Sequence, residues 1–376
     1  MKIAMVVPYF TTTIPTSEYW ESFYLRKLGH DVSVFTTSFL PPRGGRLAWG
    51  DVPVRVTTFR SANVLPDSPL PLGLPRLGEH FEVLWLQEDY PFFNQGFFVA
   101  NQALPLMMTT ERYCYPRNPL KSAVVRVLDV STLSALRRKC CLITTHSNAS
   151  KSFMHGLGVA QAKLRVIPNG VNTQIFKPYQ SRFLHNYLGI PEHSRIILTI
   201  GRLSASKGLQ ILLIAASGLL KKSNDIHLVL VGRGPEEERL RELSLLLGVS
   251  KQVHIVTALF LPYEKVPDLY NSAEICVNPS LSEPFGMTAL EAQSCGKAVV
   301  CANTGGLSDI VLDNVTGKLV SPGSQTELRA ALNELLQADP SKFETEARQR
   351  AVRFFDWHTV SQSYADSLAS CVESFS

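Results

Sequence analysis

The sequence predicts an α/β protein made of two Rossmann-like, doubly wound parallel sheets that face each other across a cleft. Three observations support this fold class. Short aliphatic and β-branched runs alternate with longer helical patterns along the chain, which is the order of parallel strands with crossover helices. These runs lack polar alternation, as strands buried on both faces do. The 376 residues also exceed what one hydrophobic core usually serves.

The first half of the chain supplies the first domain. Helical patterns are expected at Glu18–Leu28 and Leu120–Arg138. The proline- and glycine-rich region Thr37–Pro75 is expected to be mostly loop. The expected strands are Ile3–Val7, Val32–Thr36, Val54–Thr58, Val83–Leu86, Leu106–Thr109, Leu142–Thr144 and Leu164–Ile167.

The second half repeats the rhythm more regularly, with single helices between its strands. The segment Pro168–Pro178 joins the two halves. We therefore expect one domain at residues 1–176, a second at 177–355, and a C-terminal helix at 356–376. The expected strands are Ile196–Ile200, Ile226–Val231, Val253–Val256, Ile275–Val277, Ala298–Cys301 and Lys318–Val320.

Composition excludes several classes of protein. With 45% hydrophobic and 18% charged residues, the chain is typical of globular proteins. Its longest apolar run, Ile211 to Leu220, is shorter than the roughly 20 residues of a membrane-spanning helix. Pro8 interrupts the apolar start, which favours a first strand over a signal peptide. Seven scattered cysteines without a CxxC pair, and no HExxH helix, predict free thiols, no metal, no cofactor and a cytoplasmic location.

Ligands of doubly wound sheets bind at the carboxyl ends of strands. There, GRLSASKG follows the strand Ile196–Ile200, and it places Arg202 and Lys207 at the start of a helix. Glycines and two cations suit a diphosphate, although such a loop in isolation is more often an ordinary connection. The following VGRGPEEERL, Val231 to Leu240, repeats the pattern, and we expect it to be structural rather than ligand-binding.

The stretch SEPFGMTALEAQSCGKAVV follows the strand Ile275–Val277 and holds two carboxylates eight positions apart. Glu283 lies on the loop and Glu291 about one turn into the helix that follows. The amides around Gly286 and Met287 are expected to face an anion at the helix start. Alone, the pair is compatible with a turn residue and a surface residue. Together with the upstream basic loop, a single bound ligand would account for both motifs. The two cations would bind its phosphates, Glu291 would bind a ribose diol, and Glu283 would reach the group beyond the phosphates.

With these motifs in order, the second half resembles the retaining glycosyltransferases of family 4, which have the GT-B fold. The resemblance continues through the Gly305-Gly306 turn, IPNGVNTQIFKP and the tail Phe355-Asp356-Trp357. It implies a nucleoside-diphosphate-sugar donor, no metal, and a last helix that crosses back onto the first domain. It further implies catalytic roles for Glu283, Arg202 and Lys207. Donor contacts are implied for Gly201, Phe285, Gly286, Met287 and Glu291.

The first half departs from the family pattern. No glycine lies between Pro8 and Gly29, where a Gly-Gly loop is common, and Asn172 stands where an aspartate is usual. Glu111 follows the strand after which many members carry a histidine. Glu88, in a second polar loop after a strand, is a further candidate. We expect these two glutamates on the acceptor or sugar side, with a plain polar loop as the alternative at Glu88.

The segment from Arg112 to Lys151 is strongly basic, with Asp129 as its only acid. It predicts contact with an anionic membrane or a phosphorylated acceptor, in particular through Arg137, Arg138 and Lys139. The alternative is a solvated helix face. A nucleic-acid partner is not expected, because no aromatic residues are interleaved with the basic ones.

The function that follows is transfer of a hexose-type sugar, with retention, from a nucleotide sugar to a glycan, lipid or small-molecule acceptor. Two alternatives remain open: a GT-B epimerase or hydrolase acting on the nucleotide sugar, and a non-catalytic relative that binds it. A glycosidase using the two carboxylates would leave the basic loop without a role.

Overall fold

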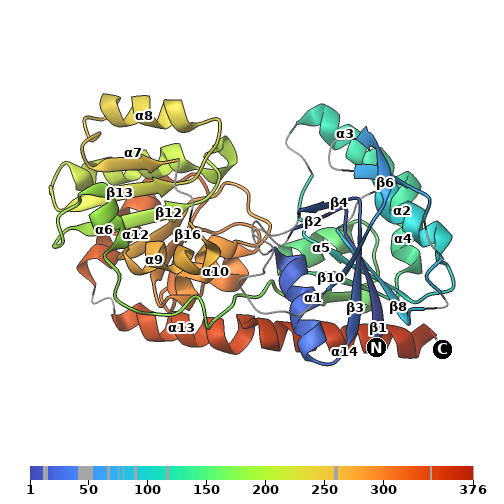
Figure 1. The fold of residues 1–376 in the computed structure, drawn as a ribbon. Helices are drawn as coiled ribbons and strands as arrows, with labels where there is room; N and C mark the ends of the chain where they lie inside the picture. Colours follow the sequence, from blue (N-terminus) through green and yellow to red (C-terminus); the bar gives the residue numbers. More distant parts are fainter. Residues whose placement is uncertain are drawn as a thin grey trace. The chain divides into compact units, whose positions relative to one another are not determined.

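The computed structural model describes residues 1–11, 16–40, 54–65, 68–74, 76–78, 80–88, 91–115, 118–257, 261–338 and 341–375. It divides into two compact units, each with its own sheet (Figure 1). Unit 1 comprises Met1–Gly170 and Trp357–Ser376, and unit 2 comprises Val171–Asp356. The joins expected from the sequence were after residues 176 and 355, whereas the contacts place them after Gly170 and Asp356.

Unit 1 contains a parallel sheet in the order β11-β10-β9-β8-β1-β3-β5. All neighbours in this sheet pair in parallel, so the predicted strands and their parallel arrangement are confirmed. The strands are β1 (Lys2–Val6), β3 (Asp31–Thr36), β5 (Arg55–Thr58), β8 (Val83–Gln87), β9 (Leu106–Thr110), β10 (Leu142–Thr145) and β11 (Leu164–Val166).

Helices cover both faces of this sheet. On β8, Leu84 and Leu86 face a core shared with α2 (Pro91–Ala100), α4 (Ser134–Lys139) and α5 (Asn148–Gly156). Trp85 points to the opposite face, because side chains alternate along a strand, and its ring packs 4.9 Å from that of Tyr364. Tyr364 belongs to α14 (Trp357–Phe375), which contacts α1 (Ser17–Lys27). The C-terminal helix therefore belongs to unit 1.

The predicted helix Leu120–Arg138 is one helical stretch with a wider turn inside it. It consists of α3 (Pro119–Leu128), the π-helical segment η1 (Asp129–Leu133) and α4. Asn118 caps its start by accepting a hydrogen bond from the amide of Lys121, and Pro119 follows at the first helical position.

The described parts of the region Thr37–Pro75 contain more strands than the one expected at Val54–Thr58. Besides β5, it contains β4 (Ser38–Leu40), which pairs with β2 (Tyr9–Thr11), and an antiparallel pair of β6 (Arg60–Leu65) and β7 (Ser68–Leu72). Pro69 and Pro71 are two residues apart on β7, so their missing N–H groups fall on the same side of the strand. Strands β4, β6 and β7 were not expected within this loop-rich region, and alternating prolines do not exclude an edge strand. Residues 41–53, 66–67 and 75 of the region lie outside the described residues.

Unit 2 contains a parallel sheet in the order β14-β13-β12-β15-β16-β17, and its predicted strands are confirmed. The strands are β12 (Arg195–Ile200), β13 (Ile226–Val231), β14 (Val253–Val256), β15 (Ile275–Asn278), β16 (Ala298–Ala302) and β17 (Gly317–Val320).

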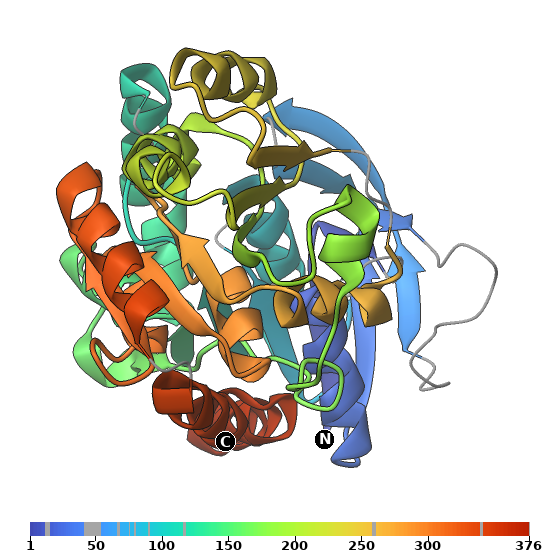
Figure 2. The ribbon, with the colours of Figure 1, turned by 90° about the vertical axis from the view of Figure 1, so that its left-hand side faces the viewer.

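Helices lie on both faces of this second sheet (Figure 2), and a hydrophobic core lies on each face. One core is built with α7 (Leu209–Leu220), α8 (Glu237–Leu246) and α12 (Gln325–Gln337). The other is built with α6 (Phe183–Leu188), α9 (Val266–Asn271), α10 (Met287–Ser294), α11 (Leu307–Ile310) and α13 (Ser341–Phe355). Short 3₁₀ turns occur at η2 (Gln161–Lys163) in unit 1, and at η3 (Ala205–Lys207) and η4 (Tyr263–Lys265) in unit 2.

Each sheet has one point where the chain reverses its direction of winding. In unit 2 the chain proceeds from β12 outward to β14 and then returns to β15, which lies on the other side of β12. In unit 1 the same reversal separates β1 from β8. The carboxyl ends of these strand pairs are where doubly wound sheets bind ligands.

Candidate functional site

The two motif loops of unit 2 meet at its reversal point. The loop from Gly201 follows β12, and the loop from Pro279 to Gly286 follows β15. The backbone amide of Leu281 donates to the carbonyl of Ser206 over 2.7 Å. The strand order, and not chance proximity, therefore joins GRLSASKG to SEPFG.

Glycines allow these loops to pack backbone against backbone. Gly208 has φ +64°, and a Cβ there would lie 2.2 Å from the carbonyl oxygen of Pro279. A Cβ on Gly232 would lie 1.8 Å from the oxygen of Gly201, and one on Gly234 would lie 2.2 Å from that of Leu203. The amide of Leu203 donates to the carbonyl of Arg233. The VGRGP loop thus packs its backbone against that of the basic loop, in agreement with the structural role expected for it.

Lys207 and Glu283 form an ion pair between the two loops. Nζ of Lys207 lies 2.6 Å from Oε2 of Glu283, whose side chain is largely buried. The same oxygen accepts a hydrogen bond from the Ser280 hydroxyl at 3.0 Å and lies 3.4 Å from Nδ2 of Asn278. All three contacts reach Oε2. Within the described part of the chain, no contact occupies Oε1, and the ammonium of Lys207 has three donors.

The other predicted groups lie around this pair. Arg202 is exposed, two residues beyond the end of β12. Gly286 (φ +114°) is the N-cap of α10 and has no side chain with which to accept the first amides of the helix, which begins at Met287. The ring of Phe285 is buried and packs on Phe355. The donor contact expected of Phe285 is therefore limited to its backbone, because its ring belongs to the core.

Glu291 lies on α10, where its Oε2 accepts a hydrogen bond from the hydroxyl of Tyr270 at 2.6 Å. Burial raises the pKa of Glu291 to about 7, and the Tyr270 hydrogen bond opposes this rise. The carboxyl consequently changes charge near neutral pH. Burial also raises the pKa of Tyr270 well above its ordinary value, which keeps its hydroxyl a donor.

A cavity of about 540 Å³ opens at the other edge of the unit 2 sheet. Its lining includes Arg195, Ile196 and Glu274, at or just before the amino ends of β12 and β15, and Lys297, just before β16. Ligands of doubly wound sheets bind at the carboxyl ends, so we assign the site by the motif loops and not by this cavity.

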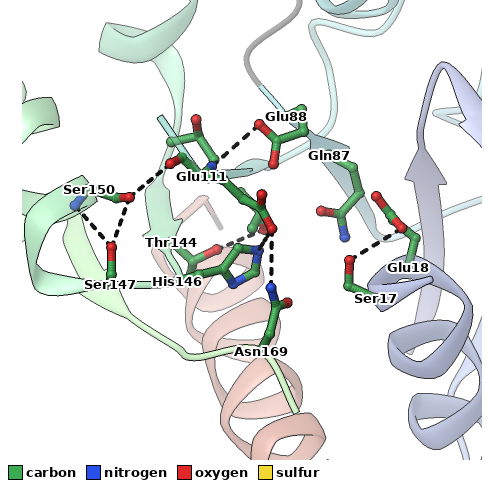
Figure 3. Close-up of polar contacts among 12 residues, drawn as sticks. Ser17, Glu18, Gln87, Glu88, Glu111, Thr144, His146, Ser147, Ser150 and Asn169 are labelled. Carbon is green, nitrogen blue, oxygen red and sulfur yellow. Dashed lines mark hydrogen bonds and ion pairs between the residues drawn. The ribbon is translucent and has the colours of Figure 1, made fainter. Parts of the chain in front are cut away.

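Unit 1 carries a polar cluster at the carboxyl ends of three adjacent strands (Figure 3). Glu88 directly follows β8, Glu111 follows β9 and His146 follows β10. One ligand atom from each of them lies within 4.8 Å of the others. Such a set can bind the hydroxyls of a sugar, and its spacing also suits a cation.

Hydrogen bonds fix the orientation of this cluster. Nδ1 of His146 lies 3.1 Å from the carbonyl oxygen of Ile167 and donates to it in the matching tautomer, which turns Nε2 toward Glu111 at 3.7 Å. Oε1 of Glu111 accepts from Nδ2 of Asn169 at 3.1 Å. Ser150 donates to the backbone carbonyl of Glu111. In Figure 3 the side chains of Glu111, His146 and Asn169 converge on one point.

A buried carboxyl lies next to this cluster. Glu21 on α1 is almost completely buried and accepts a hydrogen bond from Gln87 at the end of β8. Burial, followed by the charge of Glu18, raises the pKa of Glu21 well above its ordinary value. The carboxyl of Glu21 is therefore held largely protonated, and Glu111 adds to the same shift.

Sequence reasoning found Glu88 and Glu111 but missed His146, Asn169 and Glu21. His146 had a usable signal, because it directly follows the predicted strand Leu142–Thr144, as Glu88 and Glu111 follow theirs. Asn169 lies in the join between domains, and Glu21 lies within a helix, so no strand-end rule applied to them. Where many family members carry a histidine after this strand, the chain has Glu111. The imidazole of His146, which follows the neighbouring strand β10, lies beside Glu111.

The basic segment needs one correction. Arg137, expected on the surface, is 3% exposed and forms an ion pair with the buried Asp129 at 2.7 Å. Arg112 binds the same carboxylate at 2.8 Å. Two guanidinium groups thus neutralise the acid, so Arg137 cannot contact a membrane, whereas Arg138 and Lys139 are exposed. Among the described residues, we find no helix with the length and apolarity needed to span a bilayer.

Two protein-family models match the chain. The model described as Glycosyltransferase Family 4 matches residues 22–175, and that described as Glycosyl transferases group 1 matches residues 180–352. The D-inositol 3-phosphate glycosyltransferase of Acidothermus cellulolyticus is 34% identical over 92% of this chain and 83% of its own length. The corresponding protein of Corynebacterium aurimucosum is 26% identical over 92% and 89%.

Solved structures of other proteins share the fold. A sucrose-phosphate synthase from Thermosynechococcus elongatus aligns with a TM-score of 0.77 at 19% identity, covering 99% of each chain. Anabaena HepE in complex with UDP aligns with a TM-score of 0.77 at 21% identity, covering 98% of this chain and 100% of that one. Together with the parallel sheets and their strand-end motifs, these matches show that the chain belongs to glycosyltransferase family 4 and is a glycosyltransferase of the GT-B fold.

Proposed function

We propose that the protein transfers a hexose-type sugar from a nucleoside-diphosphate sugar to an acceptor hydroxyl, with retention at the anomeric carbon. The observation that carries this proposal is the Lys207–Glu283 pair at the reversal point of the unit 2 sheet. It places a cation and a carboxylate side by side, between a glycine-rich loop and the start of a helix. Structures of Anabaena HepE contain UDP, UDP with glucose, or UDP-glucose, which makes uridine nucleotides the first donors to test.

In this proposal the donor lies along the loops from Glu291 to Glu283. Glu291 accepts hydrogen bonds from the ribose diol, while Lys207, Arg202 and the first amides of α10 bind the diphosphate. Charge-assisted hydrogen bonds of this kind contribute roughly 1.5–3 kcal/mol each. Glu283 presents Oε1, which has no contact within the described residues, to hydroxyls of the sugar.

The chemistry breaks the bond between the anomeric carbon and the diphosphate oxygen, and that oxygen gains negative charge as the bond breaks. Lys207, which Glu283 holds in place, and Arg202 stabilise this charge. Electrostatic stabilisation by preorganised groups is usually the largest single contribution to catalysis. No metal is required in this scheme, because the two cations and the helix start do the neutralising. Retention follows if the acceptor hydroxyl attacks from the face that the diphosphate leaves.

The charge of the polar cluster of unit 1 indicates which acceptors can bind there. The curated relatives are named for D-inositol 3-phosphate, which is anionic. In this chain two carboxylates, Glu88 and Glu111, lie at the strand ends, with the acid Glu21 behind them. Carboxylates accept hydrogen bonds from hydroxyls and repel phosphates. We therefore propose an acceptor that presents uncharged hydroxyls to this cluster, such as a glycan, a glycolipid or a neutral polyol.

We also propose a cytoplasmic location. All seven cysteines are free thiols, which suits a reducing compartment. In an oxidising compartment, the exposed thiol of Cys114 would be open to oxidation. The proposal is tested by localising the tagged full chain in cell fractions, where recovery outside the cytoplasm and the inner membrane face would contradict it.

The experiment that tests transfer has two stages. A thermal-shift screen of nucleoside diphosphates and their sugars identifies the donor, and the anomeric configuration of the product is then read by NMR. The proposal predicts a glycoside with the configuration of the donor. Release of free sugar or of an epimer without any acceptor would indicate a hydrolase or epimerase, and binding without turnover would indicate a non-catalytic relative. Inositol 3-phosphate and unphosphorylated inositol, offered side by side, test the charge of the acceptor.

A further inference from the structure

Helix α3 leaves three of its aliphatic side chains largely exposed to solvent. None of its ten residues is buried. Leu120 is 78% exposed, Val124 50%, Val127 66%, and Val130, just beyond the helix on η1, 78%. Helices of globular proteins normally bury one apolar face, so these four residues, which we call the α3 stripe, need a partner.

The spacing of the α3 stripe makes it continuous. Residues 120, 124 and 127 are separated by four and three positions, which places them one above the other on a helix of 3.6 residues per turn. Val130 extends the row where η1 continues the helical stretch. The stripe is therefore a narrow apolar edge and not a set of scattered side chains.

Cations border this edge. Lys121 and Arg126 are exposed on α3 itself, and by helical geometry they project to opposite sides of the stripe. Arg138 and Lys139 are exposed further along the same helical stretch. The acid of this segment, Asp129, is buried and neutralised by Arg112 and Arg137. In the described part of residues 112–151, the exposed charge is thus positive.

We propose that the α3 stripe docks on an anionic lipid surface. Aliphatic side chains enter the boundary between headgroups and acyl chains, while lysine and arginine reach the phosphates beside them. A second copy of the chain is a poorer occupant, because a two-fold contact along the stripe would bring Lys121 and Arg126 of both copies together without an exposed acid to balance them. The proposal concerns an interaction surface, and it goes beyond the proposed transfer reaction.

Docking there would bring the unit 1 cluster close to the lipid surface. Arg112 directly follows Glu111, and its guanidinium holds Asp129 at the start of η1. The strand-end cluster and the stretch that carries the stripe are therefore linked by one ion pair. An acceptor borne on a lipid would be presented beside Glu111.

The test is flotation of the full chain with vesicles at low salt. Phosphatidylcholine vesicles are compared with vesicles that contain about one third phosphatidylglycerol, since anionic lipid attracts roughly in proportion to the number of nearby cations. The variant L120Q/V127Q removes apolar contact while keeping good helix formers on an exposed surface. The matched control is L245Q/L246Q on α8, where Leu245 and Leu246 are 67% and 85% exposed beside acidic residues.

We expect the wild type and the control to float with the anionic vesicles, and the stripe variant to bind them at least about tenfold more weakly. The variant K121E should also bind anionic vesicles more weakly than the wild type, since it removes a cation. Its binding should depend less on salt, because salt screens that attraction. Equal binding of the stripe variant, or failure of the wild type to bind, would overturn the proposal. So would a shift of the stripe variant from dimer to monomer in sedimentation velocity. Transfer to a soluble acceptor should remain unchanged in the stripe variant, which separates this test from that of the reaction.

Discussion

The carboxyl edges of the two sheets are built in different ways. In unit 2, Gly208, Gly232 and Gly234 bring loops into backbone contact, and the charged groups sit on continuous motifs. In unit 1, single residues from three strand ends meet, and side-chain hydrogen bonds fix them. An edge built of glycine-rich backbone suits a constant group such as a diphosphate. An edge built of separate side chains can be altered one residue at a time, which suits a variable acceptor.

The largest effect should come from the ion pair in unit 2. We expect Glu283→Gln to lower the rate of transfer by about 10²–10³-fold, because it removes the charge that orients both Lys207 and the sugar. Steady-state kinetics with the identified donor measure this loss. Arg239→Ala is the control, since it breaks the Glu236–Arg239 pair of the same unit at its exposed arginine. A variant that retains most of its activity would show that the pair is only structural.

Backbone contact in unit 2 can be tested with two glycines of nearly equal φ. Gly208 has φ +64° and faces Pro279, whereas Gly248 has φ +66° and nothing within 4 Å of an added Cβ. We expect Gly248→Ala to cost about 1 kcal/mol of unfolding free energy from its φ alone. Gly208→Ala should cost a further ~1–3 kcal/mol from overpacking and should weaken donor binding. Chemical denaturation and calorimetry measure both quantities, and equal losses in the two variants would contradict the packing argument.

In unit 1 we expect an effect confined to the acceptor. Glu111→Gln should raise the KM for the acceptor by about tenfold, the scale of one charge-assisted hydrogen bond, and leave the Kd of the donor unchanged. Glu82→Gln is the control, because Glu82 bonds the amide of Lys2 near the amino edge of the same sheet. A change in donor affinity would contradict the proposal that the unit 2 edge binds the donor and the unit 1 edge binds the acceptor.

The smallest effect should be one of pH on donor affinity. Because the pKa of Glu291 is raised to about 7, its carboxylate form, which we propose accepts two ribose hydroxyls, is lost as the pH falls below that value. Donor affinity should therefore decrease by up to about tenfold between pH 8 and pH 6. Tyr270→Phe removes a hydrogen bond that lowers this pKa, so the midpoint should move to higher pH. A flat profile in calorimetric titrations would exclude Glu291 from the donor site.

The folding stability of the free protein should depend on the same carboxyl, but it should fall as the pH rises, whereas donor affinity should increase. A carboxyl whose pKa is 4.5 in its ordinary state and about 7 in the folded chain binds more protons when folded. Its contribution to stability consequently falls as the pH rises from about 4.5 to 7. Comparing wild type with Glu291→Gln in denaturant at several pH values isolates this contribution.

The sequence was sufficient for the sheets and for the unit 2 loops, and the reason is physical. Apolar runs such as Ile226–Val231 can only be buried strands, and glycines flanked by cations keep a motif contiguous in the chain. The Lys207–Glu283 contact spans 76 positions but follows from the order of β12 and β15.

The unit 1 site was harder to predict because its members share no motif. His146 reaches Glu111 only through the adjacency of β9 and β10, and Glu21 becomes relevant only when α1 packs beside Gln87. Arg137 is buried against Asp129, the first residue of a π-helical segment, and no local pattern predicts such a segment. The unit 1 site could therefore not be predicted in full, because single side chains from separate elements form it and no continuous motif does.

The most direct test of the central claim is calorimetric titration of nucleoside diphosphates into the wild type and Lys207→Ala. If the loops after β12 and β15 bind the diphosphate, at least one nucleotide should bind the wild type, and the variant should bind it more than about tenfold more weakly. Equal affinity in both proteins, with their folds intact, would show that the diphosphate binds elsewhere.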